Sequence, residues 1–296
     1  MSKRRNRQNR QRVQAQGQNG RRPGEIRVPA KVVDVVMPVY GGPEFILECV
    51  RSLYKYDAGV PFNLILVDDQ SPADPKLDAA LTYVKAQENA FVFRHERNAG
   101  FAATCNTGAA TGRSPWILLL NTDIRILHDG WLQAMVKEGD DPEVAIVGAL
   151  LTFYQTPRPW APADPRIRPA GKVQHAGVVF DIMRRPYHIF SGWDPNHPKV
   201  AQRREMNCVT GACLLTRRDL WQQIGGLDIA YTRGNFEDVS YCLMARINGH
   251  KIVFTPEAHL DHYAGGSENS MTAGRNAQIF QIKMGEYVVY DEFQYW

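Results

Sequence analysis

The stretch WILLLNTDIR, Trp116–Arg125, decides the expected fold, because an apolar run ends abruptly in Asn-Thr-Asp. The run Trp116–Leu120 is short and aliphatic and follows the turn dipeptide Ser114-Pro115, which is typical of a strand buried on both faces. Ligands of a mostly parallel sheet bind beyond the carboxyl ends of its strands. Asn121 and Asp123 would stand at such an end, where their oxygens suit a hard divalent cation that also holds phosphates. A plain turn with an Asx cap is the alternative.

Outward from this strand, short apolar runs alternate with amphipathic segments from Lys31 onward, which is typical of βαβ units. The first half predicts strands at 32–40, 62–69, 91–96 and 116–120. Between them it predicts a helix at 43–56, a second helix that ends near 88, and a third at 98–112. The second half predicts a helix at 131–138, a strand at 144–151, a long loop at 156–172, apolar segments at 175–181 and 206–217, helices near 218–224 and after 237, and a strand at 251–255. We expect an α/β fold whose mixed, mostly parallel central sheet is flanked by helices.

Length and composition indicate a globular protein. At 296 residues, 44% of them hydrophobic, the chain can bury a sizeable core. It has no apolar run near the roughly 20 residues of a membrane span and no apolar region behind the charges of its N-terminus. Its five cysteines are an odd number without a C-x-x-C pair, which argues against a disulfide framework or a zinc site. We therefore expect a cytoplasmic location.

The net charge of +4 hides a strongly basic N-terminal segment. Residues 1–27 hold nine Lys or Arg against one acid, and the remaining 26 basic and 30 acidic residues leave a body near −4. Because this segment has almost no apolar residues, we expect it to be disordered. Its expected partner is nucleic acid or an anionic membrane surface. Binding to the membrane would place the protein at its inner face. A purely solubilising extension is the alternative.

Motifs at the ends of the first two predicted strands point to a nucleotide. Neither G-x-G-x-x-G nor G-x-x-x-x-G-K-[ST] occurs, so a dinucleotide-binding oxidoreductase and a P-loop NTPase lose their main support. The first strand ends in PVYGG, where Gly41-Gly42 allow the backbone to approach a ligand closely. The second ends in Asp68-Asp69, where a carboxylate can accept hydrogen bonds from a base or a ribose. Together with the D-x-D-like pair, these residues indicate a nucleotide-sugar or another nucleoside diphosphate.

Two further groups of polar residues follow in the second half. Glu237 and Asp238 begin a predicted helix, where acids complement the helix dipole or, alternatively, supply a general base. His259 and His262 follow a strand and precede a Gly-Gly pair that would suit the hinge of a closing loop. A neutral imidazole there can bind a metal, although a structural role is the more common one for a single histidine.

The collinear motifs VVMPVYGG, LILVDDQS, RNAGFAATCNTGAA, WILLLNTD, VQHAGVVFD, VTGACLLTRRDLWQQIGGLD and FEDVSYCLMARINGHKIVFTPEAHLDHYAGGS carry a resemblance. The chain resembles the family 2 glycosyltransferases, including rhamnosyltransferase-like members, from about Val32 to Ser267. The resemblance implies the GT-A fold, a Rossmann-like arrangement.

For the donor site, the resemblance implies a place for each matched residue. The PVY segment lies under the nucleotide base, and Asp68 matches the acid that contacts the base. The last acid of the D-x-D motif is the usual direct metal ligand, and His262 matches a histidine that can share the metal. The implied cofactor is Mn²⁺ or Mg²⁺. The implied nucleotide and metal residues are Val39, Tyr40, Asp68, Asn98, Gly100, Asn106, Asn121, Asp123 and His262.

For the acceptor site, the resemblance implies that Gly211 and Ala212 line the pocket and that Asp238 is the catalytic base. Glu237 orients Asp238 or binds the acceptor, or the two acids exchange roles. The implied reaction is an inverting transfer from a UDP- or dTDP-linked sugar to a hydroxyl of a glycan, lipid-linked or protein acceptor. Trp193 and the Arg-rich loop are expected to shape the acceptor cleft, unless Trp193 is a core residue.

The expected organisation has three parts. Residues 1–29 form the basic tail, residues 30–268 the GT-A domain, and residues 269–296 a C-terminal extension. Within the domain, 30–125 is the nucleotide-sugar-binding half and 126–268 the acceptor and catalytic half. The extension is a docking helix, an acceptor-site lid or an interface.

Three other functions compete with glycosyl transfer. A non-catalytic protein of the same fold, docked through its basic tail, would not need Asp238. A nucleotidyltransferase would carry a basic, glycine-rich loop after the first strand, and PVYGGPEF contains no base. A haloacid-dehalogenase-type phosphatase needs an aspartate nucleophile where Asn121 stands, and an amide cannot attack phosphorus.

Overall fold

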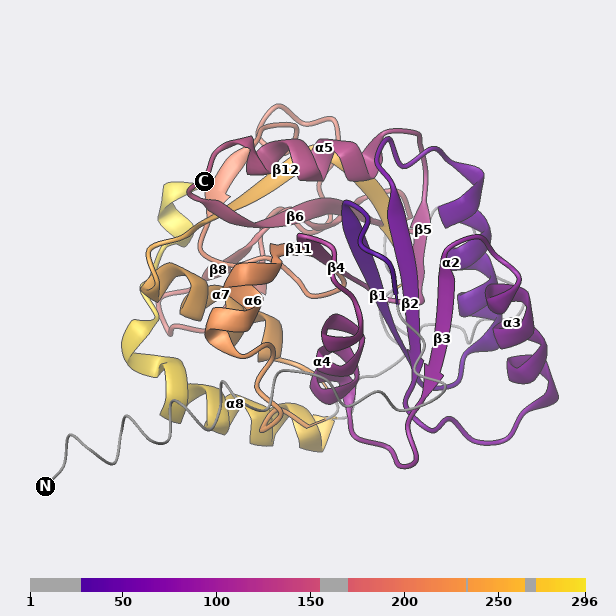
Figure 1. The fold of residues 1–296 in the computed structure, drawn as a ribbon. Coiled ribbons are helices and arrows are strands. Elements are labelled where there is room, and N and C mark those ends of the chain that lie inside the picture. Colours follow the sequence, from indigo (N-terminus) through magenta and orange to yellow (C-terminus); the bar gives the residue numbers. More distant parts are fainter. Residues whose placement is uncertain (1–27, 155–169, 233, 264–269) are drawn as a thin grey trace, which may run out of the picture.

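The computed structural model describes residues 28–154, 170–232, 234–263 and 270–296 and shows an α/β fold built on one large mixed sheet (Figure 1). Ten strands form this sheet in the order β10-β12-β6-β11-β4-β1-β2-β3, with β5 beside β12 and β7 beside β6. Their bounds are β1 Val33–Val39, β2 Phe62–Asp68, β3 Ala90–Arg94, β4 Trp116–Leu120, β5 Ile124–Ile126, β6 Val144–Phe153, β7 Val173–His175, β10 Arg204–Met206, β11 Cys213–Arg217 and β12 Lys251–His262. A separate hairpin pairs β8 (Val178–Phe180) with β9 (Pro186–His188).

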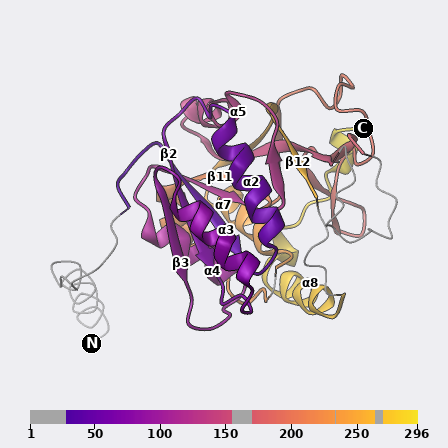
Figure 2. The same cartoon turned by 90° about the vertical axis from the view of Figure 1, so that its right-hand side faces the viewer.

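Helices cover both faces of the sheet, as the two views show (Figures 1 and 2). The helices are α2 (Pro43–Lys55), α3 (Pro75–Lys85) and α5 (Trp131–Lys137) on one face, and α4 (Phe101–Thr111), α6 (Arg218–Ile224), α7 (Glu237–Ile247) and α8 (Ser270–Met284) on the other. Short 3-10 helices lie at Glu138–Asp140, Gly285–Tyr287 and Glu292–Gln294. Along β4, Leu118 and Leu120 belong to the first core, and Ile117 and Leu119 belong to the second. The aliphatic run is therefore buried on both faces, as expected.

The strand order confirms the predicted parallel half of the sheet. β1 lies between β2 and β4, with parallel pairing on both sides, and β3 extends the sheet beyond β2. The carboxyl ends of these strands therefore meet at one edge, where Val39, Asp68 and Leu120 end them. The two halves of the chain share the same sheet, because β11 pairs with β4.

Two segments of the second half differ from their prediction. The apolar stretch 175–181 is divided between β7 and β8, because Gly177 has φ +117° and packs so tightly on Met206 that an added Cβ would lie 2.3 Å from its side chain. The last strand of the sheet was expected to end at Thr255, but β12 continues to His262. After an irregularity it pairs again with β6 and also with β5. His259 and His262 therefore lie within a strand.

Several expectations fall outside the described residues. They are the disordered tail at 1–27, most of the loop at 156–172 and the Gly-Gly pair at 265–266. All five cysteines are buried free thiols. Within the described ranges, no helix combines the length and the apolarity that crossing a membrane would need.

A buried carboxylate ties the second core to the sheet at the edge opposite the carboxyl ends. Asp34 on β1 is fully buried and accepts hydrogen bonds from Asn63 Nδ2 (2.8 Å), Ser114 N (2.8 Å), Ser114 Oγ (2.7 Å) and Arg218 (2.7 Å). Arg218, at the start of α6, also donates to the carbonyls of Ala109 and Ser114. One carboxylate therefore joins β1, β2, α6 and the segment before β4.

Replacing Asp34 with alanine should lower the free energy of unfolding by about 3–5 kcal/mol, because it leaves the Arg218 guanidinium buried without its charge partner. Urea unfolding measures this change. The control is Lys76→Ala, which removes a surface ion pair with Glu44 (3.4 Å) and should cost at most about 1 kcal/mol. Equal losses of unfolding free energy in the two variants would show that the Asp34 network stabilises the fold no more than a surface ion pair does.

Candidate active site

A cavity of about 1070 Å³ lies at the carboxyl edge of β1, β2 and β4. It is lined by Pro38, Val39, Tyr40, Gly41, Gly42, Phe45, Asp69, Asn98, Gly100, Phe101, Thr104, Asn121, Thr122, Asp123, Val178, Pro186, His188, Thr210, Gly211, Ala212, Gly234, Asn235, Phe236, Glu237, Asp238, Val239 and His262. Most of the predicted site residues are therefore brought together. A smaller hollow of about 570 Å³, between α5 and Glu257, contains none of them.

The loop after β1 forms one wall of the cavity. Gly41 and Gly42 both have positive φ, +69° and +64°, and the second is the N-cap of α2. Gly41 N donates to Ser71 Oγ at 2.7 Å, which ties this loop to the loop after β2. Tyr40 remains 63% exposed at the cavity. An exposed aromatic ring next to a flat glycine backbone offers a stacking surface for a planar base.

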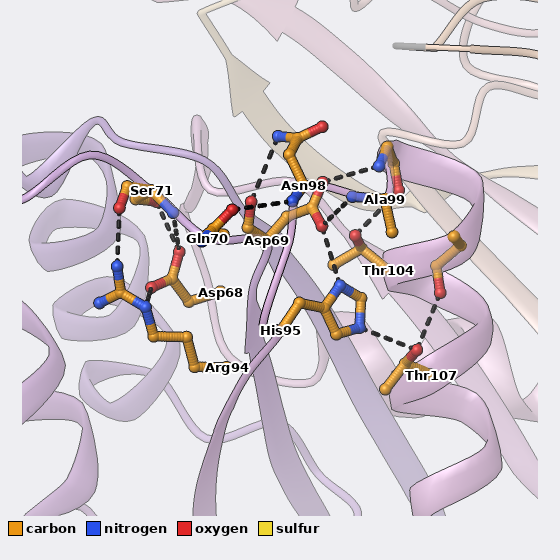
Figure 3. A network of polar contacts seen from close by, with 12 residues as sticks. Asp68, Asp69, Gln70, Ser71, Arg94, His95, Asn98, Ala99, Thr104 and Thr107 are labelled. Carbon is orange, nitrogen blue, oxygen red and sulfur yellow. Dashed lines mark hydrogen bonds and ion pairs between the residues drawn. The ribbon is translucent and has the colours of Figure 1, made fainter.

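Asp69 organises the second wall (Figure 3). Its Oδ1 accepts from Ala99 N (2.7 Å) and lies 2.8 Å from His95 Nδ1, and its Oδ2 accepts from Gly100 N (2.8 Å). Burial alone would raise the pKa of Asp69, but the Ala99 amide, the His95 ring and the Gly100 amide outweigh it and lower this pKa. His95 Nε2 reaches Thr107 on α4 at 3.0 Å. A carboxylate thus fixes the loop from which Asn98 and Gly100 line the cavity.

Asp68, the acid expected to contact the base, does not line the cavity. Its side chain is fully buried, and its Oδ1 accepts from Ser71 N (2.9 Å) and Ser71 Oγ (2.5 Å). Arg94 Nε lies 3.3 Å from Oδ2, an ion pair without hydrogen-bond geometry. Successive side chains of a strand point in opposite directions, so only one acid of the pair faces the cavity. The base contact of Asp68 remains a prediction, and the geometry favours Asp69.

Asp123 and His262 meet at the centre of the site. The Oδ1 of Asp123 lies 3.1 Å from His262 Nε2, and Tyr263 N donates to the Asp123 carbonyl at 3.0 Å. The Gln174 amide oxygen lies 2.6 Å from His262 Nδ1, which assigns the proton of a neutral ring to Nδ1. With the proton on Nδ1, Nε2 keeps a lone pair that would bind a cation together with Asp123 Oδ1. Asp123 and His262 are therefore candidate metal ligands, with Gln174 orienting the His262 ring.

Asn121 supplies a third oxygen donor. Its Oδ1 is buried and has no hydrogen-bond partner among the described residues, and the side chain lines the same cavity. A buried acceptor without a partner is costly unless a ligand satisfies it. The described residues contain no group of three His, Cys, Asp or Glu that could hold a metal. The donors present therefore fit a divalent ion that completes its coordination with substrate oxygens and water.

Asp238 presents an oriented carboxylate to the cavity. Its Oδ2 accepts from Gly211 N and its Oδ1 from Val239 N, both at 2.8 Å. A Cβ added at Gly211 would lie only 3.2 Å from the Asp238 Cβ, so the absence of a side chain permits this close approach. Main-chain amides fix the direction of the carboxylate and leave further lone pairs for a substrate proton.

Glu237 lies in a different environment. Only 5% of this residue is exposed, and its Oε2 has no hydrogen-bond partner among the described residues. Burial, and secondly the charge of Asp238, raises the pKa of Glu237 to about 8. Burial favours the neutral form of Glu237, whereas two main-chain amides hold the Asp238 carboxylate in the cavity, so Asp238 suits the role of base better.

The turn that leads into α7 is strained. Gly234, Asn235 and Phe236 follow one another with φ values of +88°, +81° and +75°. Positive φ at a residue other than glycine costs about 1–3 kcal/mol and persists only where the surroundings enforce it. This turn lines the cavity and immediately precedes Glu237 and Asp238.

Two predicted residues lie elsewhere. Asn106 does not line the cavity; its amide donates to Leu227 O (2.8 Å) and accepts from Leu227 N (2.9 Å), which joins α4 to the loop after α6. Trp193 packs on Phe190, with ring centroids 5.0 Å apart, in a small core away from the site. Sequence reasoning missed His95 and Gln174, because each acts through a partner distant in sequence.

Comparison with known proteins gives a family match and two solved structures of similar fold. The sequence model of the family described as Glycosyl transferase family 2 matches residues 34–224. The O-antigen biosynthesis protein RfbC of Myxococcus xanthus is 26% identical over 255 residues, which cover 83% of this chain and 18% of that protein.

Two solved structures show the GT-A fold. GalNAc-T7 with UDP, GalNAc and Mn²⁺ aligns with a TM-score of 0.63 at 16% identity, over 87% of this chain and 50% of that one. The mannosyltransferase PcManGT from Pyrobaculum calidifontis, in complex with GDP-Man and Mn²⁺, aligns with a TM-score of 0.56 at 15% identity. The alignment covers 90% of this chain and 67% of that one. The chain spans a quarter or less of the length of two curated relatives, RfbC and a protein of Sinorhizobium fredii.

The raised pKa of Glu237 predicts a pH-dependent stability. Between pH 4.5 and about 8 the folded protein keeps a proton that the unfolded chain has released. This contribution is fully present below pH 4.5 and is lost as the pH rises toward 8. Glu237→Gln removes this contribution. In urea unfolding at pH 5, 6.5 and 8, the free energy of unfolding of the variant should therefore rise relative to that of the wild type as the pH increases, by up to about 1.4 kcal/mol per pH unit.

The exposed Glu257→Gln variant is the control and should keep the wild-type pH dependence. A Glu237→Gln variant whose stability runs parallel to the wild type at all three pH values would contradict a protonated Glu237.

Proposed function

The chain belongs to glycosyl transferase family 2, and we propose that it transfers a sugar, with inversion, from a UDP- or dTDP-linked donor to an acceptor hydroxyl. One observation carries the proposal: a single cavity holds the Asp123–His262 pair, 3.1 Å apart, and a carboxylate of Asp238 aimed by two amides. Donor activation and acceptor deprotonation need these two kinds of group.

The donor binds along the loops after β1, β2 and β4. Tyr40 and the Gly41-Gly42 backbone receive the base, and the loop that Asp69 holds receives the ribose through Asn98 and Gly100. In support, these residues line the same cavity. The resemblance to complexes with UDP and GDP-Man concerns the fold only, so the choice of nucleotide rests on the motif resemblance.

Asp123 and His262 would hold a divalent metal, with Asn121 Oδ1 as a further oxygen donor. When bound, Mn²⁺ or Mg²⁺ neutralises the negative charge that grows on the leaving nucleoside diphosphate. The imidazole ligand favours Mn²⁺, since Mg²⁺ prefers oxygen ligands. Gln174 orients the His262 ring so that Nε2 faces the site.

Asp238 acts as the general base. It takes the proton of the acceptor hydroxyl while that oxygen attacks the anomeric carbon from the face opposite the leaving group. The bond from the anomeric carbon to the diphosphate oxygen breaks as the new glycosidic bond forms. Gly211 and Val239 hold the carboxylate in place through their amides. Glu237, protonated and buried, supports the turn behind it.

The acceptor enters from the side of β9 and the Thr210–Ala212 loop, where His188 lines the cavity. A glycan, lipid-linked or protein hydroxyl all remain proposals for its identity. The expected attachment of residues 1–27 to a membrane or nucleic acid has no support from the described residues, and the cytoplasmic location also stays a prediction.

The first test measures release of free nucleoside diphosphate from a panel of nucleotide-sugars with Mn²⁺. Asp123→Ala should weaken Mn²⁺-dependent donor binding by about 10- to 100-fold. Asp238→Asn should lower turnover by about 10²- to 10⁴-fold while donor binding persists. The surface variant Asp194→Asn is the control. Absence of donor binding in the wild type would contradict the proposed function.

A second test separates the two acids after β2. Asp69→Asn should raise the donor dissociation constant about tenfold or more, because it releases the loop of Asn98 and Gly100. Asp68→Asn should raise it less, because Asp68 reaches the loop of Gly41 only through Ser71. Isothermal titration with UDP and Mn²⁺ measures both. The reverse order would show that Asp68 contacts the base, as the family resemblance implies.

A further inference from the structure

The C-terminal helix α8 contacts the strained turn in front of the proposed base. α8 lies beyond residue 224, where the match to the family ends, and the views place it beside α7 (Figures 1 and 2). The turn at Gly234–Phe236 has three positive φ values in succession. Since side chains disfavour this conformation, some other part of the molecule must enforce it.

Asn276 provides that restraint. The residue is fully buried on α8, and its Nδ2 lies within hydrogen-bond distance of the carbonyls of Thr232 (3.0 Å), Gly234 (2.8 Å) and Asn235 (3.2 Å). An amide NH₂ group has two protons, so the three carbonyl oxygens share them around one point. The opposite amide orientation would place Oδ1 against three carbonyl oxygens, which fixes the direction of the group.

Ring packing adds a second restraint from the same helix. The Phe280 ring lies 5.2 Å from the ring of Phe236 and stacks on Phe180 at 6.4 Å. Phe280 is fully buried. α8 therefore holds the turn in two ways. Asn276 binds the carbonyl groups of the turn, and Phe280 packs on the Phe236 side chain.

The position of Asp238 depends on this turn. Phe236 is the N-cap of α7, and its carbonyl accepts from Ser240 N at 2.8 Å, so the turn sets where the helix begins. Asp238 is the second residue of that helix, and its carboxylate has to reach Gly211 N at 2.8 Å. With the Gly211 backbone this close, there is little room for a different approach.

We propose that Asn276 is a positioning residue for glycosyl transfer: it holds the turn that places the Asp238 carboxylate. This inference rests on the proposed function, in which Asp238 is the base. It assigns the C-terminal extension a role in catalysis from behind the site. Asn276 itself does not line the cavity and touches no substrate.

The test compares Asn276→Asp with Asn276→Ala. Aspartate keeps the volume of asparagine but replaces the donor with an acceptor that repels the three carbonyls. We expect turnover of the preferred donor with Mn²⁺ to fall by about tenfold or more in both variants, and further in Asn276→Asp, since a displacement near 1 Å can cost about 100-fold. The dissociation constant of UDP with Mn²⁺ should stay within about twofold, because the donor residues lie on other loops. Gln278→Ala, an exposed amide on the same helix, should match the wild type.

Hydrogen exchange supplies a readout that needs no turnover. In Asn276→Asp, the amides of residues 234–242 should lose protection while those of β1 and β4 keep it. If wild-type protein binds no donor, the proposed function fails, and the exchange result alone decides the role of Asn276. Wild-type turnover in Asn276→Asp, unchanged exchange at 234–242, or an equal loss of donor binding and turnover would each overturn the proposal.

Discussion

Carboxylates that accept main-chain amide hydrogen bonds hold the functional edge of this protein together. Asp69 binds the amides of Ala99 and Gly100, and Asp238 binds that of Gly211, each joining loops from different strands. An amide offers a fixed dipole and cannot dissociate, so it stabilises the anion without bringing a competing positive charge. Loops held in this way form the rim of the cavity, while the Asn121 Oδ1, which has no hydrogen-bond partner among the described residues, is left for a ligand.

The neighbouring acids Glu237 and Asp238 show how environment separates two identical functional groups. Both begin the same helix, and both line the cavity. Glu237 is buried without a partner for one oxygen, and its pKa rises to about 8, whereas Asp238 is held by amides. Pairs of titratable groups with contrasting surroundings are the usual way in which acid and base roles are assigned in enzymes. Here both acids directly follow a turn of three positive φ values.

Local patterns were sufficient for the first half of the fold. Val33–Val39 and Trp116–Leu120 form strands within a residue or two of their predicted bounds, because apolar runs between turn residues depend little on context. The extension of β12 to His262 could not be predicted, since it depends on pairing with β5 and β6. Alternation along a strand makes Asp68 and Asp69 point apart, but only the structure shows which faces the cavity. The roles of Asn276 and His95 could not be predicted from the sequence, because each depends on hydrogen bonds to residues on other elements.

The place of β12 in the sheet also bears on how the protein is made. This strand lies between β10 and β6, and its parallel pairing joins Lys251 to Val144, residues far apart in the chain. The βαβ units of β1 to β4 rely on nearer contacts, which form sooner than distant ones. The segment that carries β1 to β4 is therefore synthesised, and can make its nearer contacts, before His262 leaves the ribosome. The Asp123–His262 pair can form only after the last long strand has been synthesised and has entered the sheet.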